Sequence, residues 1–226
     1  MALTLGIDEA GRGSVIGSLV VCGAVFDEND LPKLKQLGVK DSKLLSPHQR
    51  ERLEGEIRKI AKDIVVEKIE PWDIDKKRGD GINLNRLEVI RFIRVIDRSF
   101  EKVKIGRVII DSPDPNLPKF RLMLANLIRR GGLEVIAEHY ADSKYIECSA
   151  ASVVAKVTRD NEIESLKEKY GDFGAGYPSD PKCIEWLENR LAVGELPEIV
   201  RHSWDTISNL KNKKLQKDLK KFLANR

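Results

Sequence analysis

Short runs of apolar residues alternate along the chain with longer segments in which apolar residues recur every three or four positions. The short runs, rich in Val, Ile and Leu, predict strands at 3–7, 15–26, 64–69, 106–111 and 133–139. The longer segments predict helices at 47–61, 82–96, 120–130 and 150–170, with further helices beyond Tyr177. Strands come first, then alternate with helices, then give way to helices. This order indicates an α/β fold with a helical C-terminal part.

Two helix boundaries are marked by residue type. Ser46 is followed by Pro47 and then Gln49, the pattern of a capping box with proline in the first turn. Gly131 and Gly132 come directly after the segment 120–130 and predict that its helix ends there.

Composition narrows the class of protein. The chain has 226 residues, 41% of them hydrophobic, which suffices for one large domain or one domain with an appendage. Charged residues make up 34% and the formal net charge is +4, a weak indication of a polyanionic partner. Cys22, Cys148 and Cys183 show no CxxC spacing, which fits a reducing compartment without disulfides or a zinc site. Charged residues interrupt the N-terminal apolar run from Asp8 onward, so we expect a cytoplasmic protein without a signal peptide or membrane span.

Glycines at positions 11, 13 and 17 suggest one candidate site, a dinucleotide-binding loop. That fingerprint requires a helix whose N-terminal amides face the pyrophosphate, but a β-branched run follows here. Asp8 and Glu9 would also repel the pyrophosphate. The pattern therefore disfavours a dinucleotide.

Acidic residues at predicted strand ends suggest a different site. Asp8 and Glu9 follow the first apolar run, Asp111 closes the fourth, and Asp142 comes shortly after the fifth. Ligand sites gather where the strands of α/β sheets end. Adjacent strand residues point to opposite faces, so Asp8 and Glu9 share a site only if the strand ends at them, as the glycines that follow predict.

Converging carboxylates require a cation. Two of them about 5 Å apart repel by roughly 3 kcal/mol at an effective dielectric constant of about 20. Oxygen ligands without His or Cys select Mg²⁺ or Mn²⁺ over zinc. The alternative is that each acid is an independent helix cap or surface charge.

Several segments together resemble the ribonuclease HII (type 2 ribonuclease H) family in its archaeal form. They occur in the family's order: IDEAGRG (7–13), KDSKLLS (40–46), INLN (82–85), IIDSP (109–113), AEHYADSKY (137–145), SAASVVAKVTRD (149–160) and GYPSDPK (176–182). In the family, GRG is usually followed by proline, with a second proline four residues on. Here Ser14 and Ser18 take these positions, a departure that concerns the stiffness of the loop rather than its chemistry.

The resemblance implies a ribonuclease H-like fold, with a five-stranded mixed sheet flanked by helices and a helical C-terminal extension. We expect a catalytic domain at 1–175 and a substrate-binding extension and tail at 176–226. The resemblance further implies an endoribonuclease that hydrolyses the RNA strand of RNA–DNA hybrids and cuts at ribonucleotides embedded in duplex DNA, in DNA replication and repair. Its catalytic and metal-binding residues would be Asp8, Glu9, Asp111 and Asp142.

The mechanism expected from this resemblance uses two Mg²⁺ or Mn²⁺ ions, with Asp8 bridging them between Asp111 and Asp142. Glu9 would contribute through its carbonyl or carboxylate, and the products would carry 5′-phosphate and 3′-hydroxyl ends. A route through the 2′-oxygen usually employs histidines. The three histidines, at positions 48, 139 and 202, lack a motif for that role, and we interpret them as surface or structural residues.

The resemblance also implies residues that bind nucleic acid. Gly11 and Gly13 expose backbone groups to the 2′-hydroxyl, and Arg12 contacts a phosphate. The alternative for GRG is a tight turn that needs glycine only for its dihedral angles. Tyr177 would pack against the sugar at the RNA–DNA junction, although an aromatic residue in such a loop also serves as a packing anchor. Lys43 would contact a phosphate, against the alternative of a solvated lysine.

The tail contains leucines at helical spacing among many lysines, which predicts an amphipathic helix that covers the core. Gln216, Leu219, Phe222 and Leu223 also resemble the box by which replication enzymes bind the sliding clamp.

Other function classes are another nuclease of the same fold, such as a transposase or junction resolvase, and a non-catalytic hybrid-binding protein. The former would lack GRG and GYPSDP, and the latter would have no need of mutually repelling acids. We expect a monomer.

Overall fold

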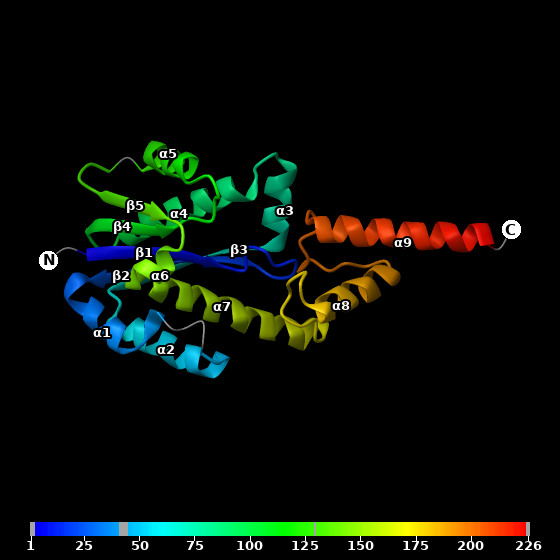
Figure 1. Cartoon of the computed structure of the whole chain (residues 1–226), viewed down its shortest axis with the longest axis horizontal. Coiled ribbons are helices and arrows are strands. Elements are labelled where there is room, and N and C mark those ends of the chain that lie inside the picture. The colour runs from blue at the N-terminus through cyan, green and yellow to red at the C-terminus, as the bar shows by residue number, and fades with distance from the viewer. Residues whose placement is uncertain (1–2, 41–44, 129, 225–226) are drawn as a thin grey trace. The chain divides into compact units, whose positions relative to one another are not determined.

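The structure is a computed structural model that describes residues 3–40, 45–128 and 130–224, without the side chains of 217, 218, 221, 222 and 224 (Figure 1). The chain forms two compact units. Unit 1 comprises Met1–Ala10, Val20–Lys68 and Asn83–Asp160, and unit 2 comprises Gly11–Leu19, Ile69–Ile82 and Asn161–Arg226. The division into a catalytic domain at 1–175 and an extension at 176–226 stays a prediction.

Unit 1 is built on a five-stranded mixed sheet, as predicted. The strands are β1 (Leu3–Ala10), β2 (Leu19–Asp27), β3 (Asp63–Ile69), β4 (Ile105–Asp111) and β5 (Glu134–Glu138). Their order in the sheet is β3-β2-β1-β4-β5. β1 pairs antiparallel with β2 and parallel with β4, and β4 pairs parallel with β5. The central strand β1 therefore joins the antiparallel part of the sheet to the parallel part.

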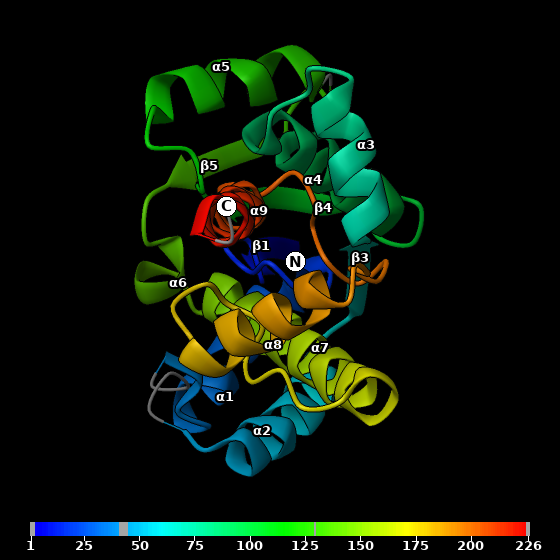
Figure 2. The same ribbon diagram turned by 90° about the vertical axis from the view of Figure 1, so that its right-hand side faces the viewer.

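Helices cover both faces of this sheet (Figures 1 and 2). On one face α4 (Leu84–Phe100) and α5 (Leu117–Leu127) pack on the strands around Phe92 and Phe120. On the other face α1 (Leu31–Gln36), α2 (Pro47–Ile60) and the first half of α7 (Ile146–Tyr170) pack around Phe26 and Val154. The short α6 (Ala141–Lys144) connects β5 to α7.

The contact between α7 and β1 depends on a glycine. A Cβ atom added to Gly6 would lie 2.2 Å from the carbonyl carbon of Glu147, a distance that no side chain tolerates. Thr4 lies two residues before Gly6, on the same face of β1. Its buried hydroxyl donates a hydrogen bond to Glu147 Oε1 at 3.1 Å. The start of α7 is therefore held directly against the central strand.

Local signals predicted some element boundaries correctly and others incorrectly. The capping box at the start of α2 is confirmed, since the Ser46 hydroxyl accepts from Gln49 N and the Gln49 side chain accepts from Ser46 N. The helix predicted at 120–130 instead spans 117–127, because the Asn116 side chain caps it at Lys119 N. Helix α3 (Pro71–Gly79) was not predicted, because its nine residues are too few to show a clear apolar stripe.

The strand predicted at 15–26 begins only at Leu19. Residues 15–18 form a loop in which Gly17 has φ +83°. The amides of Val15 and Ile16 donate to Gly176 O, so they are not available to a strand partner.

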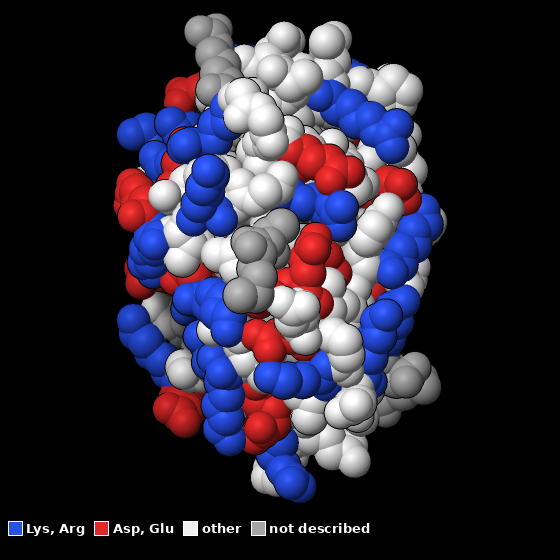
Figure 3. Space-filling view, turned by 90° about the vertical axis from the view of Figure 1, so that its left-hand side faces the viewer, with Lys and Arg blue, Asp and Glu red and all other residues white. Residues whose placement is uncertain are grey.

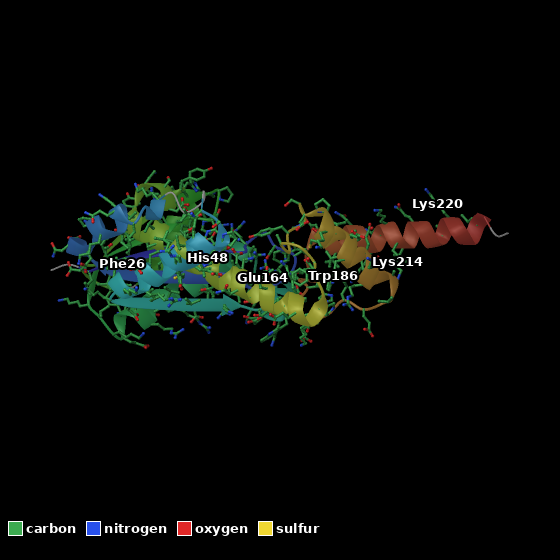
Figure 4. All side chains as sticks on the ribbon, turned by 90° about the horizontal axis from the view of Figure 1, so that it is seen from below. Phe26, His48, Glu164, Trp186, Lys214 and Lys220 are labelled. Carbon is green, nitrogen blue, oxygen red and sulfur yellow. The ribbon has the colours of Figure 1, made fainter. Side chains whose placement is uncertain are left out.

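Unit 2 contains α3, α8 (Pro181–Ala192), α9 (Asp205–Ala224) and the loop of residues 11–18. Its core gathers Val15, Ile16, Phe173 and Leu187, with Trp186 packed against them in an edge contact to Phe173. The first half of α9 is joined to α8 through Lys213, whose ammonium lies 2.7 Å from Glu188 Oε1. Figure 4 shows Trp186 on α8, and Lys214 and Lys220 on α9.

The prediction that the tail helix covers the core is wrong for its second half. Leu215, Leu219 and Leu223 are 66%, 58% and 60% exposed. They recur every four residues and form one exposed stripe of α9. The helix forms as its pattern predicts, but within unit 2 nothing covers that stripe among the described residues.

Candidate active site

Two neighbouring parallel strands bring the first pair of acids together. Ile7 on β1 pairs with Ile110 on β4, so Asp8 and Asp111 come next on the two strands. The carboxyl ends of parallel strands lie at one edge of a sheet, which is where α/β proteins place their ligand sites. Asp111 is also paired with Glu138 on β5.

The third acid is positioned by the connection after β5. Tyr140, at φ 57°, turns the chain into α6, where Asp142 lies in the first turn. Ala141 N donates to Asp111 Oδ1 at 3.2 Å, and this hydrogen bond fixes the start of α6 at the end of β4. The Ser149 hydroxyl donates to the carbonyl oxygen of Asp142, which ties α6 to α7.

Asp8, Asp111 and Asp142 form one carboxylate cluster. Each contributes an oxygen atom, and these oxygens lie within 4.8 Å of one another. Asp8 is 6% exposed and Asp142 8%, whereas Asp111 is half-buried. The predicted convergence of four acids is confirmed for Asp8, Asp111 and Asp142, and their catalytic and metal-binding roles stay predictions.

Burial and mutual repulsion change the protonation of the cluster. Burial raises the pKa of Asp8 from 3.8 to about 7, and the charges of Asp111 and Asp142 act in the same direction. A hydrogen bond from Ser152 opposes this rise. Burial likewise raises the pKa of Asp111, with a further contribution from Asp142. The metal-free cluster therefore holds its negative charge at a cost in free energy.

The donor set fits a hard divalent cation. All three ligating groups are carboxylates, and the cluster contains neither a histidine nor a cysteine among the residues that the structure describes. Such oxygen ligands suit Mg²⁺ and Mn²⁺. A cation in their midst would remove the repulsion that raises the pKa of Asp8.

The position of Glu9 differs from the prediction, which had the strand β1 ending at Asp8 and Glu9. β1 continues through Ala10, with Glu9 opposite Val21 and Ala10 opposite Val20. On a regular strand Asp8 and Glu9 point to opposite faces, and the Glu9 carboxylate is outside the described three-carboxylate cluster. Its backbone N–H donates to Asp8 Oδ1 at 2.8 Å. Glu9 thus helps to orient Asp8, and its role as a metal ligand stays a prediction.

The GRG loop, in unit 2, has two glycines with different structural requirements. Gly11 has φ +82°, a conformation that strains any residue with a Cβ atom. Gly13 is exposed, lies outside the positive-φ region, and a Cβ atom added to it would meet nothing within 4 Å. The tight-turn explanation therefore accounts for Gly11 but not for Gly13.

The remaining predicted substrate residues lie in several places. Arg12 and Tyr177 are half-buried in unit 2, and Tyr177 follows Gly176 in a turn. Lys43 lies outside the described residues. In the predicted clamp box Gln216, Leu219 and Leu223 are exposed, and the side chain of Phe222 lies outside the described part of the chain.

None of the three histidines, all of which the structure describes, belongs to the cluster of Asp8, Asp111 and Asp142. His48, on α2 in Figure 4, and His202 are exposed, which confirms their interpretation as surface residues. His139 is half-buried and its ring lies 6.5 Å from that of Tyr140.

Sequence reasoning missed two polar residues. Ser152 hydrogen-bonds to Asp8, whereas its segment, residues 149–160, contributed only to the family resemblance. Arg201 is fully buried and donates to three backbone carbonyl oxygens of the loop 11–18. A weak signal was available, because Arg201 directly follows two apolar residues, Ile199 and Val200.

A mixed sheet of the ribonuclease H type with three clustered aspartates at its edge defines a class of metal-dependent nucleases. The chain belongs to the ribonuclease HII family, because the family's sequence model matches residues 5–207. This family consists of metal-dependent hydrolases of phosphodiester bonds, and membership supports endoribonuclease activity on RNA–DNA hybrids.

Individual relatives agree with this assignment over nearly their whole length. Ribonuclease HII of Pyrococcus horikoshii is 45% identical over 224 residues, covering 96% of this chain and 98% of the relative. Ribonuclease HII of Archaeoglobus fulgidus is 44% identical over 210 residues, covering 93% and 97%.

Solved structures show the same fold. The crystal structure of ribonuclease H2 from Pyrococcus horikoshii superposes with a TM-score of 0.85 at 42% identity, covering 93% of this chain and 98% of that chain. A chain of the PCNA:RNase HII complex from Archaeoglobus fulgidus superposes with a TM-score of 0.82 at 44% identity, covering 92% and 96%.

Two further features concern the surface charge and the hydrophobicity of the helices. On the face shown in Figure 3, the described Lys and Arg side chains are interspersed with Asp and Glu rather than gathered in one basic patch. Across the described parts of the chain, every helix is too short or too polar to cross a lipid bilayer.

Proposed function

We propose that this protein is an endoribonuclease that uses two Mg²⁺ or Mn²⁺ ions to cleave the RNA strand of RNA–DNA hybrids and to cut at single ribonucleotides embedded in duplex DNA. The products carry 5′-phosphate and 3′-hydroxyl ends. The observation that carries the proposal is the cluster of Asp8, Asp111 and Asp142, whose carboxylate oxygens lie within 4.8 Å of one another. Membership of the ribonuclease HII family supplies the reaction class.

In this proposal the carboxylates of Asp8, Asp111 and Asp142 would hold the cations, with Asp8 shared between them. Its carboxylate is oriented by Glu9 N and by Ser152, and that of Asp111 by Ala141 N. Glu9 contributes a further ligand through its carbonyl or carboxylate. When bound, the cations lower the pKa of the attacking water and stabilise charge on the attacking and leaving oxygens at phosphorus.

Recognition of RNA is assigned to the GRG loop. Gly13 is exposed and has open space where a Cβ atom would be, so a ribose can approach its backbone closely. A backbone hydrogen bond to the 2′-hydroxyl distinguishes RNA from DNA. Arg12 contacts an adjacent phosphate, Tyr177 packs on the sugar at the junction, and Lys43 contacts a further phosphate.

The exposed stripe of α9 is assigned to the replication sliding clamp. Leu219 and Leu223 of the predicted box are more than half exposed, which leaves them accessible to a partner. The structure from Archaeoglobus fulgidus is a complex of PCNA with RNase HII, a relative that shares 44% sequence identity with this chain. We propose that the chain acts as a cytoplasmic monomer in replication and repair and docks on the clamp through Gln216, Leu219, Phe222 and Leu223.

The test is an endonuclease assay on duplex DNA that contains one ribonucleotide, next to an all-DNA duplex of the same sequence. We expect a single cut beside the ribonucleotide with Mg²⁺ or Mn²⁺, no cut in EDTA, and no cut by Asp8→Asn protein that still binds the duplex. Cutting in EDTA would refute the mechanism. Cutting of the all-DNA duplex would favour another nuclease of this fold, and binding without cutting would favour a hybrid-binding protein.

A further inference from the structure

The loop of residues 11–18 is held in shape by hydrogen bonds rather than by proline. Ser14 and Ser18 are fully buried. The Ser14 hydroxyl donates to Gly11 O at 2.8 Å, and Ser14 N donates to the same oxygen at 3.3 Å. Ser18 N donates to Glu162 Oε1 at 2.8 Å. Each serine therefore anchors one end of the loop.

Arg201 connects the two ends. Its Nη2 donates to Gly11 O at 2.7 Å, its Nη1 to Arg12 O at 2.9 Å, and its Nε to Gly17 O at 3.0 Å. The planar guanidinium presents its donors in a rigid fork, so one side chain fixes three carbonyl oxygens relative to one another. These oxygens belong to residues on both sides of Gly13.

The same segment joins the loop to the turn that carries Tyr177. Arg201 N donates to Val15 O at 2.9 Å. Val15 N and Ile16 N both donate to Gly176 O, at 2.8 and 3.1 Å. Gly176 immediately precedes Tyr177, so the backbones that carry Arg12 and Tyr177 are linked through Val15 and Ile16, all within unit 2.

The orientation of Arg201 is itself supported. The Trp204 ring lies 4.9 Å from the guanidinium carbon of Arg201 and 5.1 Å from that of Arg78. Asp75, on α3, accepts hydrogen bonds from His202 N at 2.7 Å and Ser203 N at 2.9 Å. The turn after Arg201 is thus attached to α3.

Burying the whole guanidinium of Arg201 carries a large desolvation penalty, which an apolar side chain in the same position would not carry. Removing a charge from water costs several kcal/mol, and apolar side chains of similar volume often replace buried ionic groups without loss of stability. Its use here is explained by the geometry of its three acceptors, which are backbone atoms of the loop proposed to recognise RNA.

We propose that Arg201 is a positioning residue of this nuclease. It holds the GRG loop and the Tyr177 turn in the one arrangement that accepts a ribonucleotide. The inference rests on the proposed function of that loop. Lysine cannot substitute, because a single ammonium group does not reproduce the fork that reaches Gly11, Arg12 and Gly17 together.

The test compares Arg201→Lys with wild type on the duplex that contains one ribonucleotide, at a temperature well below the Tm of each protein. We expect kcat/KM to fall about 10²-fold, mainly through a higher KM, since misplacement of binding groups by about 1 Å has effects of this size. Mn²⁺ binding measured by calorimetry stays at the wild-type value, because the three aspartates lie in unit 1.

The matched control is Leu53→Ala, which opens a cavity in a core cluster of unit 1 that includes no residue of the loop 11–18. It lowers Tm but keeps wild-type kcat/KM at the assay temperature. Wild-type kcat/KM in Arg201→Lys, or a loss no larger than that of Leu53→Ala, overturns the inference, as does a parallel loss of Mn²⁺ binding.

A second variant covers the case in which Arg201→Lys does not fold. Asp75→Ala removes the acceptor of His202 N and Ser203 N on the outer side of the turn, and we expect a smaller rise in KM with unchanged Mn²⁺ binding. An unchanged KM in a folded Asp75→Ala protein overturns the inference. Wild-type protein that does not cut the duplex refutes the proposed function and the inference with it, whereas active wild type and equally active variants refute the inference alone.

Discussion

Asp8 and Asp111 are each the next residue after the paired Ile7 and Ile110 on two parallel strands. Together with Asp142 they place three carboxylates within 4.8 Å of one another. The backbone therefore forces together groups that repel one another before any ligand binds. Burial raises the pKa of Asp8 to about 7 in this setting. The cluster consequently destabilises the metal-free protein. Its effect on the free energy of unfolding can be measured by changing the pH or by adding divalent cations.

The metal-free protein is expected to lose stability as the pH rises from about 4 to 7. The pKa of folded Asp8, about 7, lies above its unfolded value of 3.8, so in this window the folded state binds a proton that the unfolded state has released. The free energy of unfolding then falls with rising pH, by on the order of 3 kcal/mol. Urea unfolding in EDTA at pH 4.5 and pH 8 measures the difference. Asp8→Asn protein, which lacks the titrating group, should show a much smaller change.

Divalent cations are expected to restore this stability at pH 8. Mg²⁺ or Mn²⁺ binds the assembled cluster but not the unfolded chain, so saturation at about 100 times Kd raises the free energy of unfolding by about 2.7 kcal/mol. Thermal unfolding with and without the cation measures the shift in Tm. An equal shift in Asp8→Asn protein would show that the ion binds elsewhere.

The two glycines of the GRG loop are expected to respond differently to alanine. Gly13→Ala leaves Tm unchanged, because Gly13 has neither a positive φ nor a close neighbour, but reduces kcat/KM on the ribonucleotide duplex about tenfold or more by obstructing the ribose. Gly11→Ala lowers the free energy of unfolding by about 1 kcal/mol or more, since it places a Cβ atom at φ +82°. Wild-type kcat/KM in Gly13→Ala would contradict the assignment of this loop to RNA recognition.

Packing of α7 on the central strand is expected to fail when Gly6 is replaced. Gly6→Ala puts a Cβ atom 2.2 Å from the backbone of Glu147, and we expect a loss of about 3 kcal/mol or more in the free energy of unfolding. Gly55→Ala is the matched control, because Gly55 lies inside α2 with nothing near its Cβ position. It should stabilise the protein by up to about 1 kcal/mol. Chemical denaturation of both variants distinguishes a specific contact from a general effect of glycine.

The exposed stripe of α9 is expected to affect partner binding and not folding. Leu219→Ser and Leu223→Ser change side chains that are 58% and 60% exposed, so the free energy of unfolding should change by no more than about 0.5 kcal/mol, as for ordinary surface substitutions. Capture by an immobilised sliding clamp should be lost. Leu215→Ser, on the same stripe but outside the box, serves as the control that keeps binding. Undiminished capture of the Leu219 and Leu223 variants would rule out the proposed box.

The pattern of apolar residues determined most of the secondary structure. All five strands and the long helices α2, α4 and α7 follow from this pattern. Each helix buries one face against the sheet and needs apolar residues at matching intervals, whereas strands covered on both faces appear as continuous apolar runs. Element ends were predicted where a side chain caps its own backbone, as Ser46 does, since such interactions are local in sequence. The acids at strand ends likewise predicted the cluster of Asp8, Asp111 and Asp142.

Tertiary structure alone decided what depends on contacts between distant segments. The register of β1 with β2 continues past Asp8, so Glu9 lies outside the three-carboxylate cluster, and no local signal marks where a strand loses its neighbour. Arg201 acquires its partners because folding brings it to Gly11, 190 positions earlier in the chain. Leu219 and Leu223 follow an apolar helical pattern, yet their stripe is exposed. Periodicity specifies which face of a helix is apolar, whereas the path of the whole chain specifies whether anything packs against that face.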